Sequence, residues 1–237
     1  MLGLVEHGQV IQFCFTRKVF GYRLAQVNAF LVDGLLIDTG PSTMSREMIK
    51  ACKQLRLEQI VNTHHHEDHI GNNAVLQREF SLPIRAHRDA LPAIRQPREN
   101  LQLNPYQRLL WGWPTMAKAR RIGSHIRTPS HFFRVLPTPG HSPDHICLYE
   151  EKQGWLFAGD LLCTGSPRGF QPIWDQKLLL DSLRKVANLD LSVIFCASSG
   201  LVPDPKRLIQ RRITYWQNRL AEQAREIDIK PQIGVKY

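Results

Sequence analysis

The pattern of apolar and polar positions predicts a chain in which strands alternate with helices. Residues 27–38, VNAFLVDGLLID, form two apolar runs joined by Asp33-Gly34, a dipeptide typical of the two-residue turn of a β-hairpin. Further short apolar runs predict strands at 60–62, 84–86, 133–136, 145–149, 155–158 and 193–196.

Helices are expected between these strands. Their predicted ranges are 42–55, 71–80, 175–189 and about 205–228, the last two starting after the capping residues Asp175 and Asp204. In the last of them, Ile209, Ile213, Trp216 and Leu220 form one apolar stripe that we expect to pack on the body of the protein. This order of elements predicts an α/β fold of mixed sheets covered by helices.

The length is enough for one large folded domain or two small ones, and we expect a single domain that spans 1–237. Hydrophobic residues make up 43% of the 237 residues, and no apolar run reaches the roughly 20 residues that span a bilayer. The first residues, MLGLVEHGQVIQFCF, have none of the features of a signal peptide. The five cysteines are scattered and include no CxxC pair, which is typical of reduced thiols, so we expect a cytoplasmic protein.

The positive charge is concentrated in one segment. Between Pro92 and Arg134 there are eight basic residues and one acidic residue, which gives +7 of the formal net charge of +10. The same segment contains five aromatic residues, and its pattern predicts a helical cover over about 92–132, with a helix near 107–122 that is broken or bent at Gly112 and Pro114. Two interpretations stay open: a solvated helical face, or a cover that attracts an anionic substrate or nucleic acid.

Residues 63–69, THHHEDH, bring three imidazoles together and a fourth at His69. A packed core disfavours so many polar groups, because each one costs free energy unless it is paired. His64 and His66 lie two residues apart and can face one ion, while Asp68 and His69 follow and can face a neighbouring position. Imidazole and carboxylate are ligands that Zn²⁺ prefers, so the pattern predicts a metal site.

Two later stretches strengthen this prediction. TPGH at 138–141 follows a predicted strand, and Gly140 would let the backbone approach another element closely just before His141. FAGD at 157–160 is an apolar strand that ends in the carboxylate of Asp160. Each stretch is a weak signal alone, but both follow the histidine cluster in the order expected for a metal site.

In these stretches the chain resembles the metallo-β-lactamase superfamily. The matching segments are LIDTG at 36–40, THHHEDHIGN at 63–72, TPGHSPDHICLY at 138–149, FAGDLL at 157–162 and the strand at 193–196. The spacing is closest to the glyoxalase II-like and endoribonuclease-like small hydrolases. The resemblance implies an αββα sandwich of two mixed β-sheets flanked by helices, with metals at one edge.

The resemblance also implies a role for each residue of the site. His64, His66 and His141 would hold a first metal ion, Asp68 and His69 a second, and Asp160 would bridge them. Asp38 would support the site from behind.

The chain departs from the family pattern after its last predicted strand. The family usually has a histidine there that completes the second metal site, whereas this chain has Ser198 or Ser199, depending on the alignment. Serine is a poor ligand for Zn²⁺, so we expect the second site to be weak, filled by water or empty. Cys163 or Cys196 could substitute as a thiolate, although a small buried cysteine is the simpler interpretation.

These observations predict a hydrolase of an activated, anionic ester, thioester or lactone that uses a metal-bound hydroxide. With two metals, the hydroxide would bridge them. With one metal, Asp68 would be free to accept the proton of the attacking water, and His69 could donate to the oxyanion or the leaving group. The alternatives are a nuclease or phosphodiesterase acting on RNA or DNA, and a non-catalytic member with an incomplete second site. One or two zinc ions are expected, with iron or manganese also open. The sequence determines neither the substrate nor the oligomeric state.

Overall fold

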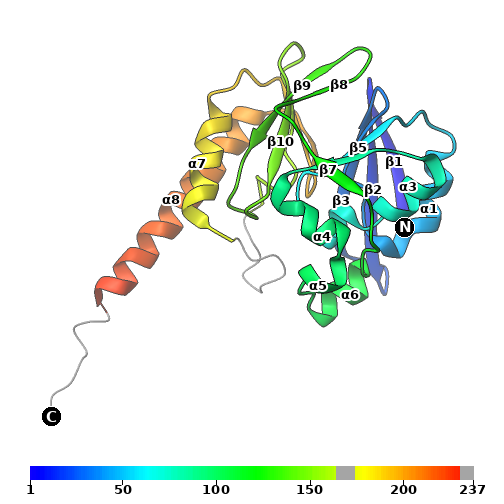
Figure 1. Ribbon diagram of the computed structural model, residues 1–237. Coiled ribbons are helices and arrows are strands. Elements are labelled where there is room, and N and C mark those ends of the chain that lie inside the picture. Colours follow the sequence, from blue (N-terminus) through cyan, green and yellow to red (C-terminus); the bar gives the residue numbers. More distant parts are fainter. Residues whose placement is uncertain (164–173, 230–237) are drawn as a thin grey trace.

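The computed structural model describes residues 1–163 and 174–229, which form four layers: helices, two β-sheets and further helices (Figure 1). The first sheet has its strands in chain order, β1-β2-β3-β4-β5-β6-β7. Their bounds are Leu2–His7, Val10–Val19, Tyr22–Val32, Leu35–Ile37, Gln59–Val61, Ile84–Ala86 and Ala119–Arg121. Strands β1 to β4 pair antiparallel, and β4 to β7 pair parallel, so the sheet is mixed.

The second sheet has the order β13-β12-β11-β10-β9-β8. In chain order, β8 to β13 are His125–Arg127, Phe132–Pro137, Ile146–Glu150, Trp155–Phe157, Val193–Cys196 and Gly200–Val202. Only β11 and β12 pair parallel among these described strands. Two mixed sheets between helices confirm the predicted fold class.

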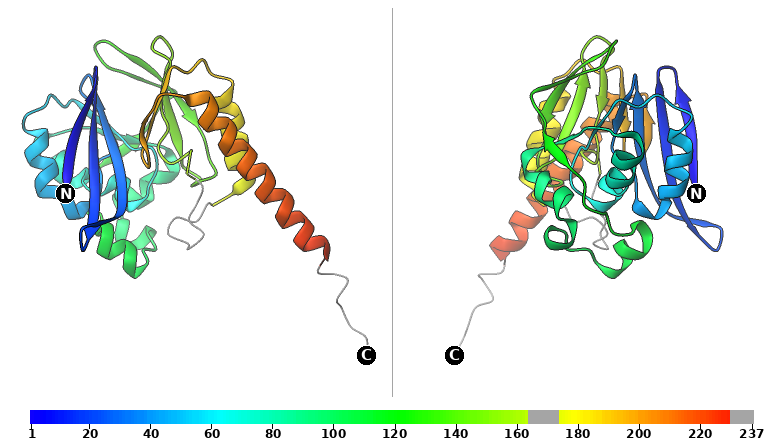
Figure 2. Two further views of the ribbon diagram at one scale, coloured as in Figure 1. Left: turned by 180° about the vertical axis from the view of Figure 1, so that it is seen from behind. Right: turned by 45° about the vertical axis from the view of Figure 1, so that its right-hand side comes forward.

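The helices divide between the two outer faces. They are α1 (Ser45–Cys52), α2 (Glu67–Ile70), α3 (Asn73–Phe80), α4 (Leu91–Arg95), α5 (Pro97–Asn100), α6 (Pro105–Trp111), α7 (Gln176–Ala187) and α8 (Pro205–Ile229). Figure 1 shows α1 and α3 outside the first sheet and α7 and α8 outside the second, and Figure 2 shows α8 projecting past the body. None of the helices within the described ranges combines the length and apolar character needed to cross a bilayer.

Three apolar clusters hold the layers together. One lies between the first sheet and its helices, one between the second sheet and α7 and α8, and one between the two sheets. Adjacent residues of β4 serve different clusters, because Leu36 packs toward the helices and Ile37 toward the second sheet. Burial on both faces explains why these central strands are continuous apolar runs rather than alternating ones. Between the sheets, Phe157 and Phe195 stack with their ring centroids 4.7 Å apart.

The predicted elements survive with small shifts in their ends. The hairpin at Asp33-Gly34 joins β3 to β4, and Asp175 caps α7 by accepting from the backbone N–H groups of Lys177 and Leu178. The predicted stripe of α8 is confirmed as an inward face, since Ile209, Ile213 and Trp216 are buried in the cluster with α7. Strands β1 and β2, by contrast, had no predicted counterpart.

The helix predicted near 107–122 is present only up to the predicted break at Gly112, and its continuation to 122 was wrong. Helix α6 stops at Trp111, where Gly112 adopts a left-handed φ of 80°, and residues 119–121 form β7 instead. Ala119 pairs with Ile84 at the edge of the first sheet, so a tertiary contact selects strand over helix. The cover segment is therefore helical only to Trp111, and its remainder contributes β7 and β8.

Candidate metal centre

The candidate site lies where strands of both sheets end. Strands β4 and β5 are parallel neighbours, so Asp38 and Thr63, which follow them closely, emerge at the same edge. The second sheet brings His141 after β9 and Asp160 after β11 to the same place. Side chains from four distant segments therefore meet at one edge of the sandwich.

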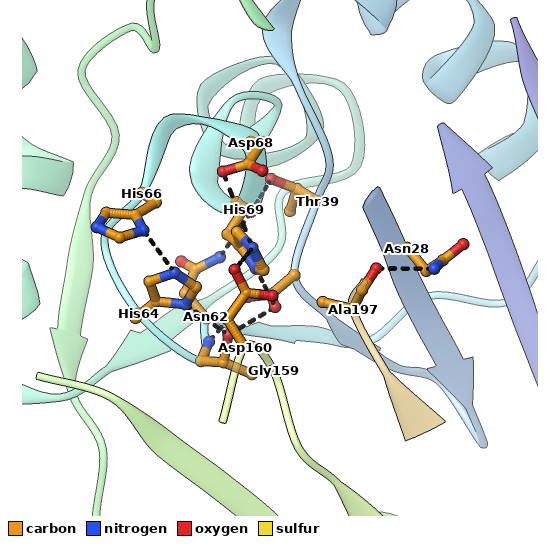
Figure 3. Close-up of polar contacts among 12 residues, drawn as sticks. Asn28, Thr39, Asn62, His64, His66, Asp68, His69, Gly159, Asp160 and Ala197 are labelled. Atoms are coloured by element: carbon orange, nitrogen blue, oxygen red, sulfur yellow. Dashed lines mark hydrogen bonds and ion pairs between the residues drawn. The ribbon is translucent and has the colours of Figure 1, made fainter. Parts of the chain in front are cut away.

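Three imidazole nitrogens converge at the first metal site, which we define as His64, His66 and His141. His64 Nε2 lies 3.0 Å from His66 Nδ1 and 3.2 Å from His141 Nε2, and the last two atoms are 3.0 Å apart. Ligands about 2.05 Å from a tetrahedral Zn²⁺ ion are roughly 3.3 Å from one another. The observed triangle has nearly that size, so these residues fit a metal ion. Figure 3 shows the two of them that follow β5, His64 and His66.

The second metal site, defined as Asp68, His69 and Asp160, contains buried polar atoms that have no hydrogen-bond partner. His69 Nε2 and Asp160 Oδ2 are both of this kind, and they lie 3.7 Å apart. Asp68 Oδ1 is 3.9 Å from His69 Nε2, and Asp160 Oδ2 is also 3.5 Å from His141 Nε2. Asp160 thus stands between the two sites, where the resemblance placed a bridging ligand, and a cation would satisfy the orphaned atoms.

Asp38 fixes the orientation of His69 from behind. Its Oδ2 lies 2.8 Å from His69 Nδ1, while its two carboxylate oxygens accept from the backbone N–H and the hydroxyl of Thr63 at 2.8 and 2.7 Å. An ionised carboxylate only accepts hydrogen bonds, so the proton of a neutral His69 sits on Nδ1 and leaves the Nε2 lone pair free for a metal. Asp38 does this from a left-handed φ of 62°, a region that aspartate tolerates better than most residues.

The sequence interpretation missed His145, which shapes the site without joining it. Its Nε2 accepts from the backbone N–H of Asp160 at 3.1 Å, and its Nδ1 lies 2.9 Å from the hydroxyl of Thr138. Gly159 leaves room for this ring, because a Cβ there would lie 2.7 Å from His145 Nε2 and the residue has a φ of 47°. The only sequence signal was a second histidine four residues after His141. Gly140 behaves as predicted, since a Cβ there would lie 2.3 Å from Leu179 of α7.

The electrostatics of the metal-free site favour a cation. Burial lowers the pKa of His64 and His66, and the neighbouring imidazoles lower it further, so both rings stay neutral and able to bind metal. Burial also raises the pKa of Asp68 to about 8, with Glu67 and Asp160 adding to the effect. Burial raises the pKa of Asp160 too, but His69 outweighs it and holds the pKa below its usual value. A divalent ion would offset the cost of charging the Asp68 carboxyl, lower its pKa and let it ionise.

The position where the family usually has the last histidine of the second metal site is an exposed turn in this chain. Ser198 and Ser199 lie between β12 and β13 and are both exposed, and the hydroxyl of Ser198 contacts Cys196 Sγ at 3.3 Å. The adjacent Ala197 carbonyl is already occupied by Asn28, whose side-chain amide donates to it at 2.7 Å (Figure 3). Cys163 is not placed to help the second site, because its Sγ lies 3.4 Å from His141 Nδ1, on the side of that ring away from His64.

A cavity of about 600 Å³ opens onto the first metal site and Asp68. Its described walls are residues 65–68 and 141–143 from the metal-binding loops, Trp174, and residues 100–104 and Gln107, which run from the end of α5 into α6. Gln107 donates to Glu67 at 2.9 Å and ties this stretch to the metal-binding loop. The described wall residues include no lysine or arginine. His69 is not among them either, because it is fully buried.

Comparisons with known proteins agree with this geometry. The model of the "Metallo-beta-lactamase superfamily" matches residues 22–198. The probable metallo-hydrolase YqjP of Bacillus subtilis is 29% identical over 89% of this chain and 78% of its own length. A hydroxyacylglutathione hydrolase of Nitrosomonas eutropha is 32% identical over 69% of this chain. The alignment spans only 55% of that hydrolase, and 45–56% of five further relatives of the same name.

Solved structures share the fold. A metallo-β-lactamase from Pontibacter korlensis superposes with a TM-score of 0.73 at 18% identity, covering 92% of this chain and all of that one. A metallo-β-lactamase family protein from Thermus thermophilus gives a TM-score of 0.68 at 23% identity, covering 89% and 81%. These comparisons confirm the predicted enzyme class, a hydrolase of this family, and leave its substrate unassigned. The chain belongs to the metallo-β-lactamase superfamily.

Proposed function

We propose that this protein is a metal-dependent hydrolase of thioesters or similarly activated esters and lactones. The observation that carries the proposal is the convergence of three imidazole nitrogens beside two orphaned polar atoms, at the floor of a cavity. Relatives named hydroxyacylglutathione hydrolase support the thioester class. His64, His66 and His141 would hold the first ion, and Asp68, His69 and Asp160 the second.

A divalent metal supplies an acidified water and polarises a carbonyl oxygen when it is bound. The chain does the rest. Asp68 lines the cavity and can accept a proton there, whereas His69 has its Nδ1 engaged by Asp38 and does not reach the cavity. We therefore propose Asp68 as the base when only the first ion is bound, and as a ligand when the second ion is also present. His69 is treated as a ligand alone, which revises the proton-donor role expected from the sequence.

The expectation of an anionic substrate also changes. The eight basic residues of the segment from Pro92 to Arg134 lie outside the described cavity wall, which carries the acidic Glu67 and Asp68. Some are used structurally: the guanidinium groups of Arg98 and Arg108 lie 4.4 and 4.7 Å from the ring centre of Trp113. We propose that any attraction for an anion at this wall comes from the metal rather than from basic side chains.

The test is a substrate panel assayed with zinc-loaded and metal-free protein. It would contain S-lactoylglutathione, the uncharged S-lactoyl-N-acetylcysteamine, and bis(p-nitrophenyl) phosphate. We expect thioester hydrolysis that needs metal, with kcat/KM values for the two thioesters within about tenfold of each other, the scale of one exposed charge interaction. His66→Ala should abolish this activity and lower the metal content, while His125→Ala, which removes an exposed histidine of β8, should change neither.

Hydrolysis of the phosphodiester alone would favour the nuclease alternative. Thioester hydrolysis that His66→Ala leaves unchanged would overturn the assignment of the site. Tightly bound metal with no turnover of any of the three compounds would favour the non-catalytic alternative.

A further inference from the structure

His65, the middle histidine of the cluster, belongs to neither metal site. Its Nδ1 lies 2.7 Å from Oδ1 of Asp144, a residue whose side chain has no exposed surface. The His65 side chain is 24% exposed and forms part of the cavity wall beside His66 and Asp68. The pair thus links the loop after β5 to the loop after β9 and presents one imidazole to the cavity.

The hydrogen bond determines which nitrogen of a neutral His65 carries the proton. An ionised carboxylate accepts hydrogen bonds and donates none, so the proton sits on Nδ1. The other nitrogen, Nε2, is then a hydrogen-bond acceptor with a fixed direction. The amides of Asn100, Gln102 and Asn104 in the described wall differ from it, because each can donate or accept.

A purely structural link between the two loops would not need a buried carboxylate. Burying a carboxylate costs more than burying a hydroxyl or an amide. Part of that cost remains in this fold, because Asp144 Oδ2 is buried without a hydrogen-bond partner. What a carboxylate adds over a neutral group is strict control of the tautomer and orientation of the ring it holds.

We propose that His65, held by Asp144, is a specificity-determining residue that binds a hydroxyl or N–H group carried by the substrate next to its scissile carbonyl. Its ring centroid lies 5.0 Å from that of the first-site ligand His66, and both rings line the cavity, so a group that contacts His65 would lie beside the bond being hydrolysed. The inference rests on the proposed hydrolase function and narrows its substrates to acyl groups with a hydrogen-bond donor near the carbonyl.

The test compares two uncharged thioesters that differ by one hydroxyl, S-lactoyl- and S-propionyl-N-acetylcysteamine. In His65→Asn, the shorter amide can keep the hydrogen bond to Asp144 but has no group at the position of Nε2. We expect the ratio of kcat/KM values, lactoyl over propionyl, to fall about threefold to tenfold, the range of one hydrogen bond. His65→Gln, whose amide oxygen reaches toward that position, should recover part of the ratio.

Two controls separate this role from a structural one. Metal content per chain should be unchanged in both His65 variants, because neither removes a ligand. His125→Asn, an exposed substitution on β8, should leave the ratio as in the wild type. A wild-type enzyme without preference for the lactoyl compound, or a preference that His65→Asn preserves, would overturn the proposal.

A second measurement covers the case in which neither thioester is hydrolysed, which would contradict the proposed function itself. Long-range ¹H–¹⁵N NMR spectra of the zinc-loaded protein report the tautomer of His65. We expect an unprotonated Nε2 whose ¹⁵N shift moves when lactate is added and stays when propionate is added. A protonated Nε2, or the same response to both acids, would overturn the inference.

Discussion

The hydrogen bonds of Asp38 allow a sharp test of how the second metal site is held. Asp38→Asn keeps the size of the side chain and tolerates the left-handed φ of 62°. The amide, however, has one accepting oxygen where the carboxylate has two. If that oxygen keeps the N–H of Thr63, the new NH₂ group faces His69 Nδ1, where the wild type has an acceptor 2.8 Å away.

A neutral His69 can then avoid two opposed donors by moving its proton to Nε2, the atom that would bind metal. Hydrogen bonds to charged groups contribute about 1.5–3 kcal/mol each, so we expect the metal-free protein to lose about that much free energy of unfolding. Affinity for the second ion should fall about 10- to 100-fold, as is typical when a group that orients a metal ligand is changed. The first ion should bind as before.

The assays are urea unfolding of metal-free protein and zinc titration in competition with a chelating dye. Asp33→Asn is a matched control, because Asp33 also has a left-handed φ, of 46°, and accepts a backbone N–H at 2.7 Å, but lies in the β3–β4 turn. An Asp38→Asn protein as stable as the wild type in urea would refute the reasoning.

Three further changes test other parts of the site. Wild-type protein dialysed without chelator should retain about one zinc ion per chain by elemental analysis, and Ser198→His should raise this toward two; two ions in the wild type would mean that the serine turn does not weaken the second site. Gly159→Ala should lower the free energy of unfolding by about 1–3 kcal/mol through its strained φ and its contact with His145. Gly123→Ala, where nothing lies within 4 Å of the new Cβ, is the control, and equal effects of the two changes would contradict the steric argument. Burial, then His141, lowers the pKa of His145 to about 3, below the usual value of about 6.5. As the pH falls, the imidazole is therefore protonated in the unfolded state before it is protonated in the folded state. Stability from this group is therefore full above about pH 6.5 and declines toward pH 3, and His145→Gln should flatten that part of the pH profile of metal-free unfolding; an unchanged profile would show that His145 does not titrate in this way.

The chain by itself determined the elements whose signal is local. The Asp33-Gly34 turn, the Asp175 cap and the apolar runs at 84–86 and 193–196 depend on neighbouring residues, and the structure has each where the pattern predicts it. The candidate metal ligands could also be predicted from the sequence, because few residue types bind metal ions and the spacing of these histidines and aspartates is distinctive. Family resemblance supplied the division between two sites.

Tertiary structure decided what depends on distant contacts. The segment at 119–121 is a strand because Ile84 offers an unpaired edge, although its local pattern favoured a helix. His145 and the His65–Asp144 pair gain their roles only from loops that folding brings together, and sequence spacing carries no sign of such contacts. Residues 100–104 and Gln107 line part of the described cavity wall, whereas the eight basic residues between Pro92 and Arg134 do not, since charge along a sequence does not say which side chains face inward.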